Sequence, residues 1–259
     1  MFTRIKFHLL EGLNKIGVNI VKINSGLGYK IILIRDFNNN LKKHLKNILE
    51  LKNIDCILDV GANTGQYGKY IRGLGFSGHI FSFEPCNVSY KKLIEASAKD
   101  EKWHVFQCGL GDSTSTMAMN VFPENSVFSS LLKVKKGGLL ETKYNLNDFE
   151  VYSEDVDVFR MDEIMPSKIE EFGFKRIFLK MDTQGYDSYV FKGAKGILKN
   201  IVSIQSEISL IEVYDDMMNY HDSLKLYEEN SFLVSGLYPV SRDEKSLAII
   251  EYDCIMVRY

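Results

Sequence analysis

The chain has 259 residues, of which 45% are hydrophobic and 12% aromatic, enough apolar material for one substantial core. Charged residues make up 25% and nearly balance at a net charge of −2, so the basic excess typical of a nucleic-acid-binding protein is absent from the sequence. We therefore expect no nucleic-acid partner. Since no run of about 18 apolar residues occurs, we expect no transmembrane segment.

The first 50 residues predict a helical extension. Between residues 1 and 24, apolar side chains recur at intervals of three and four, the period of one helix face. Such a helix either lies on a membrane surface or packs on the rest of the chain or on a second subunit, and we favour packing, which leaves a homo-oligomer possible. Residues 26–35 predict a short strand pair or an extended segment, and residues 38–51 a second helix.

From residue 54 onward, strands and helices alternate. Strands are predicted at 54–60, 79–83, 103–108, 176–182, 202–207, 232–237 and 252–257, and helices at 65–73, 88–100, 186–199 and 221–229. Apolar strands separated by helices predict a mainly parallel sheet that is covered on both faces. Right-handed crossovers make this a doubly wound, Rossmann-like α/β fold.

A long insertion, at about 113–161, separates the third and fourth strands of this pattern. Its segments 114–122 and 156–159 predict extended structure, so we expect a β-rich insertion. Loops this long inside a compact domain are usually lids or binding loops. None of the four prolines marks a linker, and we expect one domain over residues 51–259.

The four cysteines are Cys56, Cys86, Cys108 and Cys254, and they form no CxxC pair of the kind found in zinc or thioredoxin-like sites. Three of them fall in runs typical of strands, where a free thiol packs as a small hydrophobic group. The N-terminus lacks an apolar stretch followed by a small-residue cleavage site. We therefore expect a reduced, cytoplasmic protein.

The clearest functional signal is DVGANTGQ at 59–66, directly after a buried strand and before a helix. Gly61 and Gly65 let the backbone turn tightly and approach a ligand, and the helix that follows offers free N–H groups to an anion. In an open parallel sheet, this turn is where a nucleoside ligand binds. The loop from Asp59 to Gln66 suits the carboxylate of a methionine moiety, whose ammonium group Asp59 could receive directly or through water.

Two more strand ends carry candidate ligand contacts. Glu84 lies 25 residues after Asp59 and is placed to accept hydrogen bonds from both ribose hydroxyls, although it could instead be an N-cap or a solvated acid. In CGLGD at 108–112, backbone groups near Gly109 could frame an adenine and Asp112 could bond its amino group. A tight turn that needs two glycines explains this segment nearly as well.

Nicotinamide-dependent oxidoreductases are the main alternative within this fold. Their fingerprint is GxGxxG, and the corresponding stretch here is GANTG, with Asn63 where the second glycine should be. That glycine lets a pyrophosphate approach the backbone, so its absence argues against NAD(P). None of the 14 tyrosines is followed by a lysine four residues later, as short-chain dehydrogenases require.

Together these segments resemble the FkbM-type methyltransferases, class I enzymes that use S-adenosylmethionine and many of which methylate hydroxyls of sugars or polyketides. The matching segments are ILDVGANTGQY (57–67), FSFEP (81–85), CGLGD (108–112), VFRMDEI (158–164), KMDTQGYD (180–187), IQSEIS (204–209) and EYDCIMVR (251–258). The resemblance covers about 54–258 and implies cofactor contacts at Asp59, Gly61, Asn63, Gly65, Glu84 and Asp112. Many relatives carry a glutamate where Gln184 stands, and residues 1–50 match nothing in the family pattern.

Methyl transfer depends mainly on alignment of the acceptor oxygen, the methyl carbon and the sulfur, which is worth about 7–11 kcal/mol. A base that takes the acceptor proton adds about 10²–10⁴-fold. The candidates are Asp182, Glu207 and Lys180, at the ends of the fourth and fifth strands. The alternative is that Lys180 and Asp182 form a structural ion pair and Glu207 caps a loop.

The two acids could also hold Mg²⁺, but no histidine or third acid is clearly placed to help, so we expect no metal. We expect S-adenosylmethionine-dependent O-methylation of a hydroxyl on a sugar, a glycan precursor or a secondary metabolite. On the resemblance, Ser129 and Ser130 of the insertion could touch this small-molecule or glycan substrate. An NAD(P)-dependent oxidoreductase and a non-catalytic cofactor-binding module are the alternatives.

Overall fold

A computed structural model describes residues 18–22, 29–33, 40–123, 126–139, 150–243 and 245–258. The chain divides into two compact units, residues 1–47 and 48–259, and each is described by itself. In the first unit, β1 (Val18–Lys22) and β2 (Tyr29–Leu33) form an antiparallel pair. The helix α2 (Leu41–Leu51) confirms the helix expected over 38–51.

The expected helix over residues 1–24 is wrong for Val18–Lys22, which form a strand. This segment is rich in β-branched residues, which favour a paired strand over a helix. Residues 1–17 and 23–24 of the expected helix lie outside the described residues. The domain boundary near residue 50 stays a prediction.

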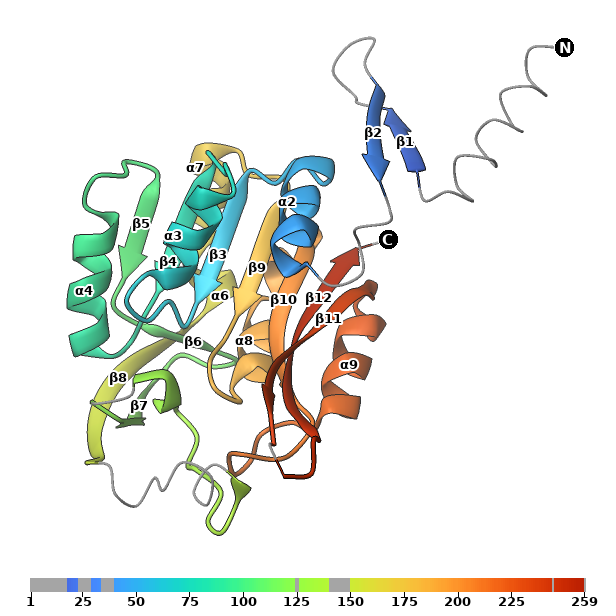
Figure 1. Cartoon of the computed structure of the whole chain (residues 1–259). Coiled ribbons are helices and arrows are strands. Elements are labelled where there is room, and N and C mark those ends of the chain that lie inside the picture. Colours follow the sequence, from blue (N-terminus) through green and yellow to red (C-terminus); the bar gives the residue numbers. More distant parts are fainter. Residues whose placement is uncertain are drawn as a thin grey trace, which may run out of the picture. The chain divides into compact units, whose positions relative to one another are not determined.

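The second unit is built on a seven-stranded sheet with the order β11-β12-β10-β9-β3-β4-β5 (Figure 1). Strands β10, β9, β3, β4 and β5 are parallel, while β12 is antiparallel to both β10 and β11. This confirms the expected α/β fold with a mainly parallel, Rossmann-like sheet. The strands are β3 (Cys56–Val60), β4 (His79–Phe83), β5 (Trp103–Phe106), β9 (Ile177–Met181), β10 (Ile201–Ser209), β11 (Phe232–Arg242) and β12 (Ile249–Arg258).

Helices connect these strands. They are α3 (Gln66–Gly73), α4 (Asn87–Ser97), α6 (Met161–Ile164), α7 (Pro166–Phe172), α8 (Asp187–Gly193) and α9 (Tyr220–Glu229), with 3₁₀ turns η2 (Ser126–Phe128) and η4 (Lys195–Asn200). The helix expected over 186–199 is α-helical only to Gly193, where i→i−3 hydrogen bonds from Ala194 and Ile197 tighten the chain into η4. No helix in the described ranges is long and apolar enough to cross a bilayer.

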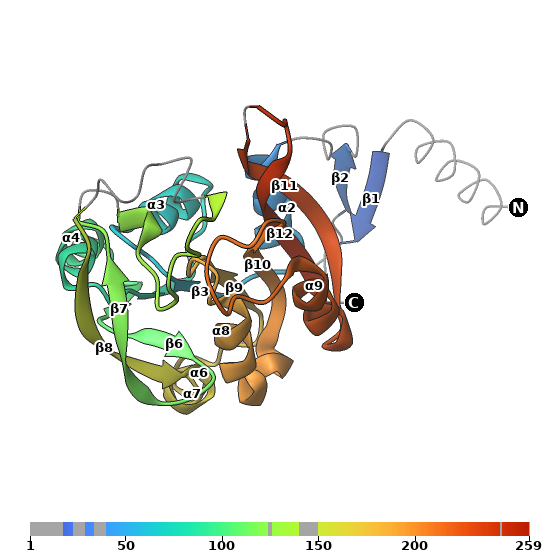
Figure 2. The ribbon, with the colours of Figure 1, turned by 90° about the horizontal axis from the view of Figure 1, so that it is seen from below.

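The insertion contributes two strands, β7 (Ser115–Val121) and β8 (Tyr152–Arg160), to a separate three-stranded sheet. The third strand is β6 (Gly109–Gly111), just before the insertion, and the order is β6-β8-β7. Figure 1 shows this small sheet beyond the carboxyl ends of β3 and β4, and Figure 2 shows β6, β7 and β8 from below. Strands β7 and β8 confirm the extended structure that we expected in the insertion. The tight turn considered as an alternative for 108–112 is instead largely strand β6, which pairs in parallel with β8. A Cβ on Gly111 would lie 2.9 Å from Val158, so glycine there allows two strands to pack closely.

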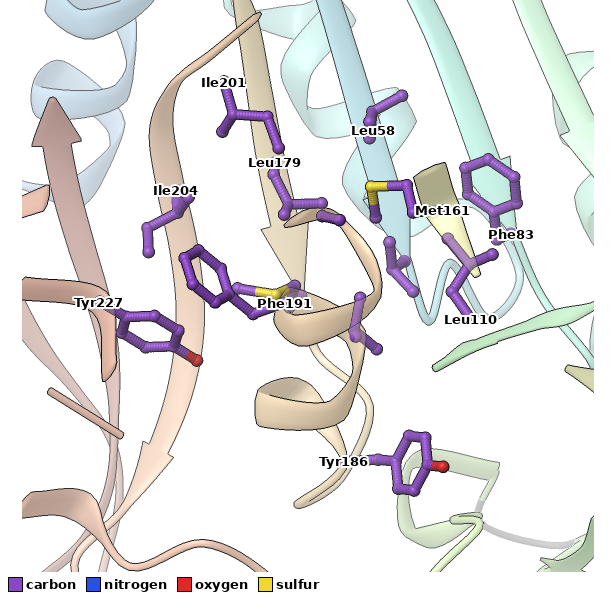
Figure 3. Packing of buried hydrophobic residues seen from close by; sticks show 14 of the residues in the cluster. Leu58, Phe83, Leu110, Met161, Leu179, Tyr186, Phe191, Ile201, Ile204 and Tyr227 are labelled. Atoms are coloured by element: carbon purple, nitrogen blue, oxygen red, sulfur yellow. The ribbon is translucent and has the colours of Figure 1, made fainter. Parts of the chain in front are cut away.

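The hydrophobic core lies where β3, β4 and β9 face α6 and α8. Leu58 of β3 and Leu179 of β9 are fully buried and pack in one cluster with Met161 of α6 and Phe191 of α8 (Figure 3). Each such side chain contributes about 1.5–3 kcal/mol by leaving water. All five residues of β3 and of β9 are buried, as expected for central parallel strands covered on both faces.

The carboxyl ends of β3 and β9 touch through backbone atoms. The N–H of Asp182 donates to the carbonyl oxygen of Val60 at 3.1 Å. Gly61 has a φ of 73°, and a Cβ built on it would lie 2.0 Å from the carbonyl oxygen of Asp182. Glycine is therefore required at position 61 because of a contact between two strand ends, and not only because of ligand approach.

We expect Gly61→Ala to lower the free energy of unfolding by about 2–5 kcal/mol, because the left-handed φ is strained for alanine and the methyl group overlaps a carbonyl. Gly73→Ala is the matched control, since nothing lies within 4 Å of a Cβ there. It should be neutral or stabilising by up to about 1 kcal/mol. Denaturant unfolding measures both variants, and equal effects at the two positions would contradict the contact.

Candidate active site

A cavity of about 490 Å³ lies at the carboxyl ends of the parallel strands. We name its two parts by their carboxyl groups: the cofactor end carries Glu84, and the acid end carries Asp182 and Glu207. The ends of β3 and β4 line the first part, and those of β9 and β10 line the second. Residues of η2 and of β11 and β12 complete the wall.

Glu84 follows β4 directly, and its side chain is held by backbone donors. The N–H of Asn63 donates to Oε2 at 2.8 Å, and the N–H of Cys86 donates to Oε1 at 2.9 Å. Glu84 is 5% exposed, and this burial raises its pKa to about 7, against the two hydrogen bonds, which lower it. Each carboxylate oxygen can accept a further hydrogen bond, so the group can receive two hydroxyls from a ligand in the cavity.

Asn63 organises the loop between β3 and α3. Its φ of 47° is left-handed, a conformation that asparagine tolerates better than most residues. Its Oδ1 accepts hydrogen bonds from Ser126 at 3.1 Å and from Ser89 at 3.4 Å. One residue thus connects the loop to Glu84, to the insertion and to α4.

A buried ion pair lies beneath this loop. Lys180 Nζ is 3.2 Å from Asp59 Oδ1, and the two side chains are 5% and 0% exposed. Lys180 also donates to the carbonyl oxygen of Gly61 at 3.0 Å, and Ser82 donates to Asp59 Oδ2 at 3.0 Å. Burial alone would lower the pKa of Lys180, but Asp59 and Asp182 outweigh it and raise that pKa. Lys180 therefore keeps its proton and holds the loop.

At the acid end, one amide contacts two carboxyl groups. Gln184 Nε2 donates to Asp182 Oδ1 at 3.2 Å and to Glu207 Oε2 at 2.8 Å. Burial raises the pKa of Glu207 well above its usual range, and the charges of Asp182 and Glu251 raise it further. A carboxylate with a raised pKa is a better proton acceptor at neutral pH than an exposed one, so Glu207 suits a general base.

The profile of the FkbM methyltransferase domain matches residues 59–233, more than half of the chain. The chain belongs to this family. The match covers the loop between β3 and α3, which we call the cofactor-end loop, and the acid pair (Asp182 and Glu207). It therefore includes residues from both parts of the cavity.

Among proteins of known identity, this FkbM-family chain is 28% identical to the methyltransferase sdnD of Sordaria araneosa over 166 residues, which are 58% of this chain and 64% of that protein. The chain thus matches less than two thirds of that relative's length. It is also similar to Aeropyrum pernix fibrillarin with natively bound S-adenosyl-L-methionine (12% identity, TM-score 0.42, 96% of this chain and 86% of that one). A putative S-adenosylmethionine-dependent methyltransferase from Listeria monocytogenes gives 8% identity and a TM-score of 0.45, over 84% of this chain and 97% of that one. Both structural similarities are too weak to identify a function.

Membership of the FkbM family makes S-adenosylmethionine the cofactor, and the cofactor end fits it. The buried carboxylate of Glu84 can accept both ribose hydroxyls. Nearby, the cavity wall is formed by Gly61 and Gly109 and by the apolar Phe83 and Leu110. Glycines and apolar side chains of this kind leave room for a flat base.

Of the expected cofactor residues, Gly61, Asn63, Glu84 and Gly109 line the cavity. Asp59, Gly65, Gln66 and Asp112 are not among the described lining residues. Asp59 is completely buried against Ser82 and Lys180, so its expected contact with the cofactor stays a prediction without support from this geometry.

The other three residues outside the wall have structural partners. A Cβ on Gly65 would lie 3.0 Å from Ala96, so this glycine lets α3 pack on α4. Gln66 Oε1 accepts the N–H of Thr64 at 3.0 Å. The carbonyl oxygen of Asp112 accepts a hydrogen bond from Arg160 at 3.2 Å, at the far end of β6. Their roles in cofactor binding stay predictions without support from this geometry.

Of the expected catalytic residues, Asp182 and Glu207 line the cavity, and Lys180 is not in the described wall. Lys180 lies 3.5 Å from Asp182 Oδ2, as in the alternative of a structural ion pair. A lysine that keeps its proton cannot accept one, so the expected role of Lys180 as a base stays a prediction that this geometry does not support. No group of three or more metal-ligating side chains is found in the part of the chain that the structure describes.

Two site residues were missed by the sequence analysis. Gln184 was noted only as a departure from the family pattern. Its backbone has a left-handed φ of 53°, and the only nearby feature of the sequence that indicates a turn is the glycine that follows it. Glu251 reaches the wall because β12 pairs with β11, where it lies opposite Ser241. Antiparallel register at the far edge of a sheet cannot be read from one short segment. Ser129 and Ser130, noted from the resemblance, do line the cavity.

We expect Glu84→Gln to weaken the binding of S-adenosylhomocysteine about 10–100-fold, because hydrogen bonds to a charged group contribute about 1.5–3 kcal/mol. The pKa of Glu84 is about 7 in the cofactor-free protein, so wild-type affinity should fall as pH falls below 7 and level off above it. Protonation removes the negative charge that the ribose hydroxyls favour.

Calorimetric titration on both sides of pH 7 measures this dependence. Glu84→Gln should lose it, whereas Glu95→Gln, at an exposed position of α4, should keep the wild-type affinity and pH profile. The same decline below pH 7 in Glu84→Gln as in the wild type would show that another group controls binding.

Proposed function

We propose that this FkbM-family protein transfers the methyl group of S-adenosylmethionine to a hydroxyl of a sugar, a glycan precursor or a secondary metabolite. The observation that carries the proposal is that Asp182 and Glu207 line the same cavity as Glu84. When bound, S-adenosylmethionine supplies an electrophilic methyl group on a positively charged sulfur. The chain must then orient the cofactor, place a hydroxyl and receive its proton.

These tasks fall to different parts of the wall. Glu84 holds the ribose at the cofactor end, which fixes the cofactor relative to the strand ends. Placement of the acceptor in the same cavity supplies most of the rate enhancement, about 7–11 kcal/mol for well-aligned groups. The acid pair accepts the proton of the hydroxyl, and the raised pKa of Glu207 favours it for this step.

The charge of the wall supports an acceptor without phosphate groups. Four carboxyl groups line the cavity, those of Glu84, Asp182, Glu207 and Glu251. Like charges repel, so an anionic acceptor would be disfavoured, and an uncharged polyhydroxyl compound can instead form hydrogen bonds with these groups. This also supports the proposal that nucleic acid is not the substrate.

The alternatives receive less support. The family match favours methyl transfer over NAD(P)-dependent oxidation. A non-catalytic module would not need two carboxyl groups in one cavity at the strand ends. All four cysteines are free and buried, which supports a reducing, cytoplasmic location.

One member of the acid pair accepts the proton, so either Asp182→Asn or Glu207→Gln removes the base. We expect the variant that removes it to lower kcat about 10²–10⁴-fold. Binding of S-adenosylhomocysteine should change little, because Glu84 is intact. Mass spectrometry of uncharged sugars and hydroxylated metabolites incubated with the wild type identifies the acceptor for this assay. Glu170→Gln, at an exposed position of α7, is the control.

Unchanged turnover in both active-site variants would remove the catalytic assignment. Wild-type protein that binds the cofactor and yet methylates no acceptor would favour the non-catalytic module.

A further inference from the structure

The amide of Gln184 lies between two carboxyl groups from neighbouring strands. Asp182 follows β9 and Glu207 belongs to β10, and both accept hydrogen bonds from the same nitrogen, at 3.2 and 2.8 Å. An amide nitrogen has two hydrogens, so it can serve both acids at once. Both donors of Gln184 are thus used on the acid pair.

The orientation of this amide is determined by a third contact. The hydroxyl of Tyr214 donates to Gln184 Oε1 at 2.9 Å, which places the nitrogen on the side of the acids. The Ser130 hydroxyl donates to the carbonyl oxygen of Gln184 at 2.7 Å and so connects it to the insertion. These contacts hold a backbone with a φ of 53°, a left-handed conformation that costs a non-glycine residue about 1–2 kcal/mol.

The charges around Glu207 are mainly negative. Asp187 of α8 accepts the N–H of Glu207 at 3.0 Å, and Glu251 and Asp253 of β12 add further acids. Lys180 of β9 is paired with Asp59 and Asp182. In such surroundings, a neutral donor favours the ionised form of a carboxyl group without adding charge.

On the basis of the proposed function, we propose that Gln184 is a positioning residue that holds the acid pair together and keeps it able to accept the proton of the acceptor hydroxyl. Its two N–H groups offset the repulsion between Asp182 and Glu207. Its link to Ser130 makes this arrangement depend on the insertion, which also contacts the cofactor-end loop through Ser126 and Asn63. Gln184 thereby sets the lower limit of the pH range in which the pair is a base.

The test is a titration of the Glu207 carboxyl carbon by ¹³C NMR in the full chain, assigned from the signal that Glu207→Gln removes. Gln184→Met keeps the length of the side chain and removes both donors. It should raise the pH midpoint of Glu207 by at least about one unit, since two carboxyl groups then face each other without a donor. Gln107→Met, at an exposed position after β5, should leave the midpoint unchanged.

An unchanged midpoint in folded Gln184→Met would overturn the proposal, because a residue that only fills space would not alter the titration. If that variant does not fold, Tyr214→Phe decides: loss of the hydroxyl frees the amide, and the midpoint should again rise. An unchanged midpoint there would equally overturn the proposal.

The titration needs neither an acceptor nor methyl transfer, so its failure is distinct from failure of the proposed function, which appears as wild-type protein without turnover. With an acceptor in hand, Gln184→Met should shift the acid limb of the pH profile of kcat upward by the same amount as the NMR midpoint. A kcat lowered equally at every pH would indicate a merely structural role.

Discussion

The contact between the ends of β3 and β9 is the constraint on which the rest of the site depends. Gly61 approaches the carbonyl oxygen of Asp182 so closely that no side chain fits. Beneath it, Lys180 pairs with Asp59 and donates to the carbonyl oxygen of Gly61. The loop that carries Asn63 is thus joined to the strand that carries the acids. The cofactor end and the acid end are therefore held at a fixed separation.

This arrangement places carboxyl groups with different environments in one cavity. Glu84 is buried and bonded to backbone N–H groups, and its pKa of about 7 lets it ionise when hydroxyl donors approach. Glu207 is partly buried among other acids, which raises its pKa well above the usual range, while the side-chain amide of Gln184 donates a hydrogen bond to it. Titratable groups whose environments separate their pKa values are commonly assigned different tasks. We propose that Glu84 serves cofactor binding and Glu207 serves proton acceptance.

Much of the fold was predictable because buried strands and their helices have local signals. The strand His79–Phe83 was predicted with its observed bounds, and DVGANTGQ correctly marked the first strand-to-helix turn. The features that the sequence did not indicate depend on contacts between distant segments: β6 pairs with a strand about 50 residues later, and the charged Lys180 forms an ion pair with Asp59 from another strand. Four of eight expected cofactor residues and two of three expected catalytic residues lie on the described cavity wall, because a motif indicates a loop but not which of its side chains face inward.

The central claim is that one cavity binds the adenosyl cofactor at Glu84 and presents its sulfur to the acid pair. A crystal structure of the full chain with S-adenosylhomocysteine tests this most directly. The account predicts both ribose hydroxyls within hydrogen-bond distance of the Glu84 carboxylate and the sulfur on the side of Asp182 and Glu207. An adenosyl group bound elsewhere, or a ribose that Glu84 does not contact, would contradict it.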